Sequence, residues 1–375
     1  MDVNEIKLSE NKTAYIAIIG RKAYKINYSF YTIISLLQVN YSLDDACKKV
    51  SDLTGFEEVK LKDIFVSFLN LAEHQSSKIS YMHFRKILIS EDNIRRISKW
   101  MNILYNKKIF ITLLMTSIII NFLFFFFNGN KIKIDLYFSN VWLYFGLFTS
   151  YLVSLFFHEF GHASACSFLG KTSHEIGFGI YFIFPVLYTD VTCVWTLKPS
   201  KRILVNFGGI YFQLIFNTCL ILAEVVINNI LIRTCLLNLS LANITIMITS
   251  FIPFFFFFGY WMLSDFIGVD NLLQKSDNCI FNIITHYGNI KFNKKQNICK
   301  LLIFGILNWM FRIYIFYFLC KNVCLNFLGI MYNKSVFSNL KSIGIIFISI
   351  IGIFWMLSQY IQFFRKRSIN SLSNF

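Results

Sequence analysis

Two histidines and a glutamate stand close together in the run HEFGH, residues 158–162. If this run is helical, His158 and His162 are four residues apart and lie one above the other on the same face. Two imidazoles placed in this way can bind one metal ion, and Glu159 beside them can take a proton from a water molecule on that ion. The spacing therefore predicts a metal-dependent hydrolytic site, with His158 and His162 as ligands and Glu159 as the catalytic base.

Zinc is the metal that this pattern predicts, because zinc binds imidazole nitrogens in a tetrahedral arrangement. A catalytic zinc needs a third protein ligand and keeps its last position open for water or substrate. The ion lowers the pKa of its water to about 7 and polarises the carbonyl group under attack. We therefore expect Zn2+ as the cofactor and a third ligand from elsewhere in the chain.

The motif follows the apolar run YFGLFTSYLVSLFF, residues 144–157. Ionisable side chains at the depth of such a run are costly in a membrane unless they have partners, so they usually mark a functional site. The alternative is that the histidines are unrelated polar groups that reach the interface from the end of a helix. The cost of burying such groups together favours the functional interpretation.

The composition of the chain indicates a membrane protein. Of the 375 residues, 56% are hydrophobic and only 15% are charged, whereas a soluble protein carries about 25% charged residues. The net charge of +16 comes from Lys and Arg residues that cluster beside apolar segments. This distribution suits the anionic cytoplasmic face of a membrane and argues against nucleic acid as a partner.

Six apolar segments have roughly the 20 residues that a helix needs to cross the hydrocarbon core. Basic residues are concentrated before the first segment, between the second and third, between the fourth and fifth, and after the sixth. The positive-inside rule therefore predicts a mainly α, multi-pass protein of the cell membrane with about six transmembrane helices and both termini in the cytoplasm. The polar residues 1–12 lack the pattern of a signal peptide, which also favours a cytoplasmic amino terminus. The segments are 109–128, 139–163, 204–231, 236–262, 300–320 and 342–364.

Residues 1–78 predict a small soluble α+β domain. Two short strands, 13–20 and 22–28, are followed by three helices with amphipathic spacing. This order of elements resembles the winged-helix-like PqqD-like domain, whose members bind the leader segment of ribosomally made peptides along a sheet edge. A generic winged-helix-like adaptor is the alternative. Residues 79–107 predict a polar, helical, amphipathic linker.

A second family resemblance begins at the motif. The run HEFGHASACSFLGK, residues 158–171, resembles the core of the site-2 protease family of intramembrane zinc metalloproteases. The following run, HEIGFGIYFIFPVLYTDVTCVW at 174–195, resembles a branch of that family found with peptide-modification and bacteriocin-export systems. The residues that match this branch are Pro185, Tyr188, Thr189, Asp190 and Trp195.

Two later segments extend the resemblance. The run SKRILVNFGG at 200–209 is similar to the family's basic segment and small-residue turn. The run IPFFFFFGYWMLSDFIGVDNL at 252–272 is similar to the family's Asn-Pro…Asp-Gly segment. The resemblance covers roughly residues 80–275. It implies a membrane metalloprotease core over 108–275 and leaves 276–375 as C-terminal membrane helices.

One residue of the family pattern is missing. The resemblance implies that the third zinc ligand is the Asp of Asp-Gly, but the residue before Gly259 is Phe258, and the Asn before Pro is replaced by Ile252. Asp190 is the tentative third ligand, and it is equally suited to shaping a substrate-binding hairpin. Asp265 is less favoured, because two helical turns from Phe258 amount to roughly 10 Å. His174 and Cys193 have ligand chemistry, but their spacing favours an interfacial polar residue and a buried filler.

These observations support two functions. The first is a zinc metalloprotease that processes a ribosomally made peptide in or near the bilayer. Its expected partners are a peptide substrate or leader peptide, membrane lipid and a peptide exporter. The alternative is a catalytically impaired pseudoprotease that binds a peptide as an export or immunity partner. A solute transporter fits less well, because it requires polar residues spread over several apolar segments or internal repeats, and the segments show neither.

Overall fold

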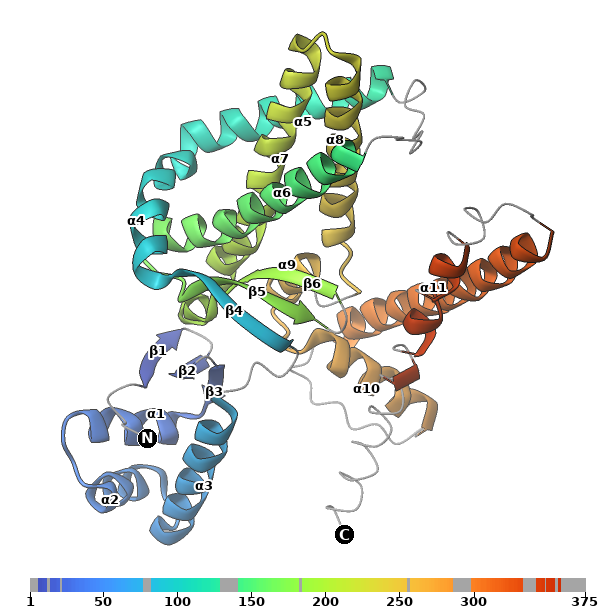
Figure 1. Cartoon of the computed structure of the whole chain (residues 1–375). Helices are drawn as coiled ribbons and strands as arrows, with labels where there is room; N and C mark the ends of the chain where they lie inside the picture. The colour runs from blue at the N-terminus through green and yellow to red at the C-terminus, as the bar shows by residue number, and fades with distance from the viewer. Residues whose placement is uncertain are drawn as a thin grey trace. The chain divides into compact units, whose positions relative to one another are not determined.

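Figure 1 shows the computed structural model of the chain, which is mainly helical with two small sheets. The predicted mainly α fold class is therefore confirmed. The chain divides into two compact units, Met1–Asp270 and Asn271–Phe375. The structure describes residues 6–11, 14–20, 22–76, 82–128, 141–181, 184–254, 257–285, 298–332, 342–347, 349–354 and 357–358.

The amino-terminal elements are a three-stranded antiparallel sheet and three helices. The strands pair in the order β1-β2-β3, of which the sequence predicted only the second and third. Ile33, Val50 and Phe65 are fully buried in the core that the helices share with the sheet. Asn27 and Ser42 begin the first two helices, because each side chain accepts a hydrogen bond from a backbone N–H of the first turn. The elements are β1 (Lys7–Asn11), β2 (Ala14–Ile19), β3 (Lys22–Ile26), α1 (Tyr28–Gln38), α2 (Leu43–Thr54) and α3 (Glu58–Ser76).

The segment predicted as a helical linker begins with a strand. The helical prediction is wrong for residues 82–90, which pair with a later strand in an antiparallel register that places Lys86 opposite Phe178. The β-branched residues Ile87 and Ile89 of this segment suit a strand. A helix then follows, as predicted. The elements are β4 (Met82–Ser90), α4 (Glu91–Met101) and the short 3-10 helix η2 (Asn102–Tyr105).

The second sheet has the order β4-β5-β6 and is antiparallel throughout. Its last two strands, β5 (Glu175–Tyr181) and β6 (Phe184–Thr189), form a hairpin. Gly177 is required at its position in β5, because a Cβ there would approach the phenol oxygen of Tyr188 to 2.5 Å. Within the described residues β6 is an edge strand.

Four described helices are long and apolar enough to cross a membrane. A fifth long helix, α6 (Val141–Phe168), carries the HEFGH motif. The predicted segment 342–364 is described only in part, and residues 342–354 include a shorter apolar helix. Figure 1 shows α5, α6, α7 and α8 lying beside one another. The four membrane-length helices are α5 (Lys107–Asn128), α7 (Pro199–Val226), α8 (Ile230–Ser250) and α11 (Ile298–Tyr332).

The fourth predicted segment, 236–262, is not one helix. It is divided into the end of α8 at Ser250 and the beginning of α9 (Phe258–Ile267). Pro253 lies in the break, and proline cannot continue a helix because it lacks the N–H group that the next turn requires. The span predicted at 236–262 therefore begins and ends earlier, as α8.

Glycines bring α6 and α7 into direct contact. A Cβ at Gly208 would approach the carbonyl oxygen of Gly161 to 2.5 Å, and a Cβ at Gly161 would overlap the backbone of Gly208. Tyr105 of η2 also binds at this contact, because its hydroxyl donates a hydrogen bond to the Gly161 carbonyl oxygen at 2.9 Å. The main chain of the motif helix α6 therefore packs directly against the main chain of α7.

The carboxy-terminal unit places an arginine in an apolar helix. Asp277 of α10 (Leu272–Thr285) accepts a hydrogen bond from Trp309 Nε1 at 3.1 Å and pairs with Arg312 at 3.1 Å. Burial raises the pKa of the Asp277 carboxyl, an effect that the Arg312 guanidinium opposes. The pairing offsets part of the cost of placing Arg312 in α11.

Candidate metal centre

The three motif residues lie together and are buried. His158, Glu159 and His162 expose only 4%, 6% and 3% of their surfaces. The two imidazole Nε2 atoms are 3.1 Å apart, so the histidines share one face of α6 as their spacing predicts. We call them the histidine pair.

The outer nitrogens of the histidine pair are held by oxygen acceptors. His158 Nδ1 lies 2.9 Å from Gln213 Oε1, and His162 Nδ1 lies 2.8 Å from the Val205 carbonyl oxygen. A carbonyl oxygen only accepts, so each Nδ1 carries the proton of the neutral ring. Each Nε2 therefore presents a lone pair to the other, an arrangement that is favourable only when a cation or a proton lies between them. Metal-bound histidines are oriented by the same kind of Nδ1 contact.

Gly209 of α7 leaves room beside the facing nitrogens. A Cβ at this position would approach His162 Nε2 to 2.6 Å and His158 Nε2 to 2.8 Å. Only a residue without a side chain allows both imidazoles to keep their position. The glycine thus belongs to the site, whereas its place in the sequence predicted only a small-residue turn at 200–209.

A network of buried amides extends from Gln213 across four helices. Gln213 Nε2 donates to Asn243 Oδ1 of α8, and Asn243 Nδ2 donates to Asn217 Oδ1 of α7. Asn217 in turn donates to Asn121 of α5, and Ser154 of α6 donates to Asn243. We call these residues the amide network. Polar residues are therefore spread over several apolar segments, and the expectation that they are not is wrong.

Glu159 is held by the sheet. The hydroxyl of Thr189, the last residue of β6, donates to Glu159 Oε2 at 2.7 Å. The same hydroxyl lies 3.1 Å from the Glu159 carbonyl oxygen. One carboxylate oxygen is thus engaged, and the position of the carboxylate depends on where β6 ends.

Phe258 lies over the histidine pair. Its ring centroid is 4.6 Å from that of His158 and 4.3 Å from that of His162, on which it stacks. Phe258 is the first residue of α9. The residue that replaces the expected aspartate therefore lies beside the histidine pair, but it has no atom that can bind zinc.

The structure does not bring Asp190 to the histidine pair. One Asp190 oxygen accepts from the N–H and the hydroxyl of Thr192 at 3.0 and 2.6 Å. The other lies 3.9 Å from Arg85 and has no hydrogen-bond partner in the described structure. The Asp190 side chain thus contacts Thr192 in the segment after β6, and its alternative role in shaping a substrate-binding hairpin stays a prediction.

Asp265, His174 and Cys193 are also engaged elsewhere. Asp265 pairs with Arg202, whose guanidinium lies 4.8 Å from the centre of the Trp195 ring. Burial raises the pKa of the Asp265 carboxyl, and Arg202 opposes this effect. His174 Nδ1 lies 3.2 Å from Glu91 of α4, and Cys193 is buried in an apolar cluster. In the described part of the chain, no three His, Cys, Asp or Glu residues form a group that could hold a metal ion.

The residues present would therefore supply only two of the three protein ligands that a catalytic zinc needs. Comparisons with protein-family models, with curated proteins and with solved structures each found no match. The relation to intramembrane zinc proteases and the third zinc ligand thus remain predictions.

A buried ion pair joins the three strands of the second sheet beside the site. Arg85 of β4 pairs with Glu175 of β5 and donates to the hydroxyl of Tyr188 in β6. The Tyr188 hydroxyl donates to Glu175 at 2.7 Å. Burial and the Glu175 carboxylate raise the pKa of the Tyr188 phenol, so this group stays protonated and keeps donating. Arg85 could not be predicted from the sequence, because it belongs to no motif, and Glu175 lies in the run at 174–195 without being one of the residues that match the family branch.

Proposed function

We propose that the chain is a membrane-embedded zinc metalloprotease that cleaves a ribosomally made peptide in or near the bilayer. The observation that carries this proposal is the histidine pair, whose facing Nε2 atoms are oriented for one cation and have Glu159 beside them. His158 and His162 would hold the ion, and Gln213 and Val205 would orient them. When bound, zinc supplies a water of lowered pKa and polarises a carbonyl group. Glu159, held at Oε2 by Thr189, is left with Oε1 to accept a proton.

The edge strand β6 is suited to present the substrate. A peptide in extended form can add to a free sheet edge through its main chain, and β6 ends at Thr189, which contacts Glu159. A helical peptide in lipid would have to unwind first, because its amides are internally bonded. Pairing with β6 would thus expose the peptide bond beside the base.

The remaining parts of the chain complete this proposal. We propose six membrane spans with both termini in the cytoplasm, in which α6 and residues 342–364 add to the four membrane-length helices. Residues 1–78 would bind a leader peptide along a sheet edge, in the manner of PqqD-like domains. The partners would be the substrate peptide, the cell membrane and a peptide exporter. The three-stranded sheet of this part supplies the edge strands that such binding needs.

A second function is favoured by one observation. Phe258, which stands where the missing ligand is expected, stacks on His162 and contacts the ring of His158. Two imidazoles alone hold zinc weakly and without the fixed geometry that catalysis needs. The alternative proposal is therefore a pseudoprotease that binds a peptide for export or immunity without cleaving it.

Zinc content of the purified full-length protein tests the choice. We expect about one zinc per chain in the parent, loss of zinc in His162→Ala, and unchanged zinc in His174→Ala. His174 is the matched control, because its imidazole contacts Glu91 outside the site. A parent protein without zinc, purified under conditions in which related enzymes keep theirs, contradicts the hydrolase and supports the peptide-binding alternative.

The role of Glu159 is tested separately. We expect Glu159→Gln to keep its zinc and to abolish cleavage of small peptides co-expressed from neighbouring genes, as read by mass spectrometry. The amide can still accept a hydrogen bond from Thr189, but it cannot accept the proton of a water molecule. Continued cleavage by this variant would show that Glu159 is not the base.

A further inference from the structure

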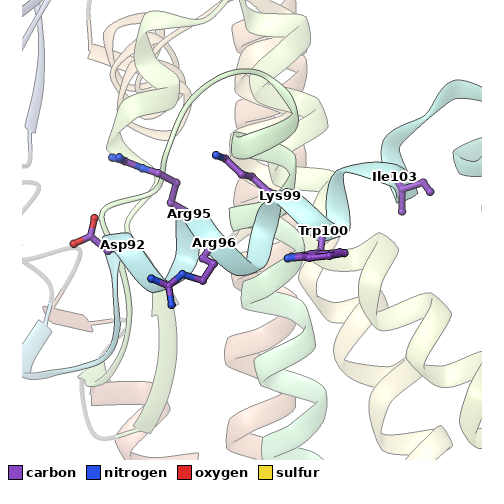
Figure 2. A pocket seen from close by; sticks show the side chains of 6 residues that line it. All are labelled: Asp92, Arg95, Arg96, Lys99, Trp100 and Ile103. Carbon is purple, nitrogen blue, oxygen red and sulfur yellow. The ribbon is translucent and has the colours of Figure 1, made fainter.

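One face of α4 carries cations and exposed apolar side chains together. It lines an open groove of ≈ 790 Å³. Figure 2 shows the charged ends of Arg95, Arg96 and Lys99 extending from the α4 ribbon, with the Trp100 ring beside them. We call this surface the α4 outer face. Its residues are Asp92, Arg95, Arg96, Lys99 and Trp100 of α4, together with Ile103 of η2.

The opposite face of α4 is fixed against the protein. Ile94 and Ser98 are 0% and 1% exposed, and Ile94 packs with Ala163 of α6 and Ile176 of β5. At 3.6 residues per turn, Arg96, Lys99 and Trp100 lie on the side of the helix away from these contacts. The α4 outer face is therefore turned outward by the packing of the helix.

The apolar side chains of this face lie next to a membrane-length helix. Trp100 is 83% exposed and Ile103 is 62% exposed. The helix α5 begins shortly after them, at Lys107. Its own apolar residues Met115 and Phe122 are 54% and 65% exposed, as expected where a helix faces lipid. If α5 crosses the bilayer, Trp100 and Ile103 lie near the interface, where tryptophan is enriched.

Two cations of this face are not neutralised by neighbours. Arg95 pairs with Glu91 at 3.1 Å, whereas the described residues give Arg96 and Lys99 no ion pair. Among the described residues, Asp92 is the one carboxylate that lines the groove. The face thus combines free cations with an exposed indole ring.

We propose that the α4 outer face binds the headgroup of an anionic phospholipid in the bilayer that holds α5. Arg96 and Lys99 contact the phosphate, while Trp100 and Ile103 lie at the boundary between headgroup and acyl chain. An amphipathic helix with cations beside an aromatic residue is the usual form of such a binding surface. An acidic peptide would satisfy the cations, but it would not account for two large apolar side chains exposed beside α5. This proposal does not depend on protease activity.

Lipid binding to the full-length protein in neutral detergent tests the proposal. The probes are phosphatidylglycerol and phosphatidylcholine with the same acyl chains, and native mass spectrometry gives the affinity of the first bound lipid. We expect the parent to prefer phosphatidylglycerol. The Arg96→Gln/Lys99→Gln variant should bind phosphatidylglycerol about thirty-fold more weakly, because each cation near an anionic headgroup contributes about 1 kcal/mol.

Two further variants make the result specific. Lys48→Gln/Lys60→Gln removes the same charge from α2 and α3, at exposed positions, and should keep the parent preference. Trp100→Ala should weaken the binding of both lipids, since it removes the ring and no charge. Equal phosphatidylglycerol binding by the parent and by Arg96→Gln/Lys99→Gln overturns the proposal. It is also overturned if that variant loses binding of a labelled Glu-rich peptide while its lipid binding is unchanged.

Discussion

Gly209 and Phe258 determine what the histidine pair can do. Gly209 leaves space beside the two Nε2 atoms, and Phe258 covers the rings without offering a ligand atom. The HEFGH spacing was sufficient to predict the pair, because four residues make about one helical turn. Gln213 and Val205 could not be predicted, since they reach the imidazoles from another helix, and only the packing of α6 on α7 brings them there.

Filling the space at Gly209 should remove the metal. In Gly209→Ala the new methyl group would displace both imidazoles, so we expect zinc content to fall well below that of the parent. Gly329→Ala is the matched control, because it lies in α11 with no atom within 4 Å of its Cβ position. That variant should keep its zinc and gain up to about 1 kcal/mol of helix stability. Elemental analysis of both variants gives the answer, and normal zinc in Gly209→Ala would contradict the geometry of the site.

Replacing Phe258 by aspartate should strengthen metal binding. Phe258→Asp places a carboxylate beside the histidine pair and completes a set of three ligands. We expect zinc affinity to rise at least ten-fold, or about 1.4 kcal/mol, as measured by competition with a chromogenic chelator. Phe258→Asn is the control, since its amide is a much poorer zinc ligand. Equal zinc affinities in the parent, Phe258→Asp and Phe258→Asn would show that residue 258 does not contribute to the coordination of the ion.

At the scale of elements, the sheet beside the site is built from distant parts of the chain. The β5–β6 hairpin lies in the run that carried the family resemblance, but β4 comes from the segment predicted as a helix. The charged residues Arg85 and Lys86 of β4 also occur in exposed helices, and the pairing with β5 selects the strand. Arg85 then pairs with Glu175 of the neighbouring strand, and no local sequence pattern predicts this contact.

Removing Arg85 should destabilise this sheet. Arg85→Met would leave the Glu175 carboxylate buried without its cation, since the two side chains are only 20% and 3% exposed. The expected loss is about 3 kcal/mol, measured by unfolding in detergent. The neighbouring exposed Lys86→Met is the control and should change stability by less than about 0.5 kcal/mol. Adding Glu175→Gln to Arg85→Met should restore part of the loss, and no recovery would mean that the ion pair is not the cause.

At the scale of the whole molecule, the composition of the apolar runs predicted that membrane-length helices are present, but it did not predict where each helix begins and ends. The apolar runs predicted the membrane-length helices α5, α7, α8 and α11. The boundary of the fourth segment was displaced because Pro253 ends the helix within an uninterrupted apolar run. The amide network could not be predicted, because each apolar segment shows only isolated Asn or Gln residues. Only the packing of the helices brings these side chains into contact. In a membrane such contacts hold helices to one another.

The proposed topology can be measured directly. Green fluorescent protein fused after Phe375 should fluoresce, and alkaline phosphatase fused there should be inactive, because six spans return the carboxy terminus to the cytoplasm. Alkaline phosphatase fused after Asn229, between α7 and α8, should be active, since three spans precede it. An active phosphatase at Phe375 would require an odd number of spans.

The glycine contact between α6 and α7 would limit how the proposed peptide substrate could enter. With Gly161 and Gly208 touching through their main chains, no side chain can rotate aside to open a gap on that flank. The flank near Phe258 is different, because Pro253 interrupts the helical run between α8 and α9. We expect a lipid-embedded peptide to arrive from this second flank, so bulky residues introduced near Phe258 should block entry before they affect the histidines.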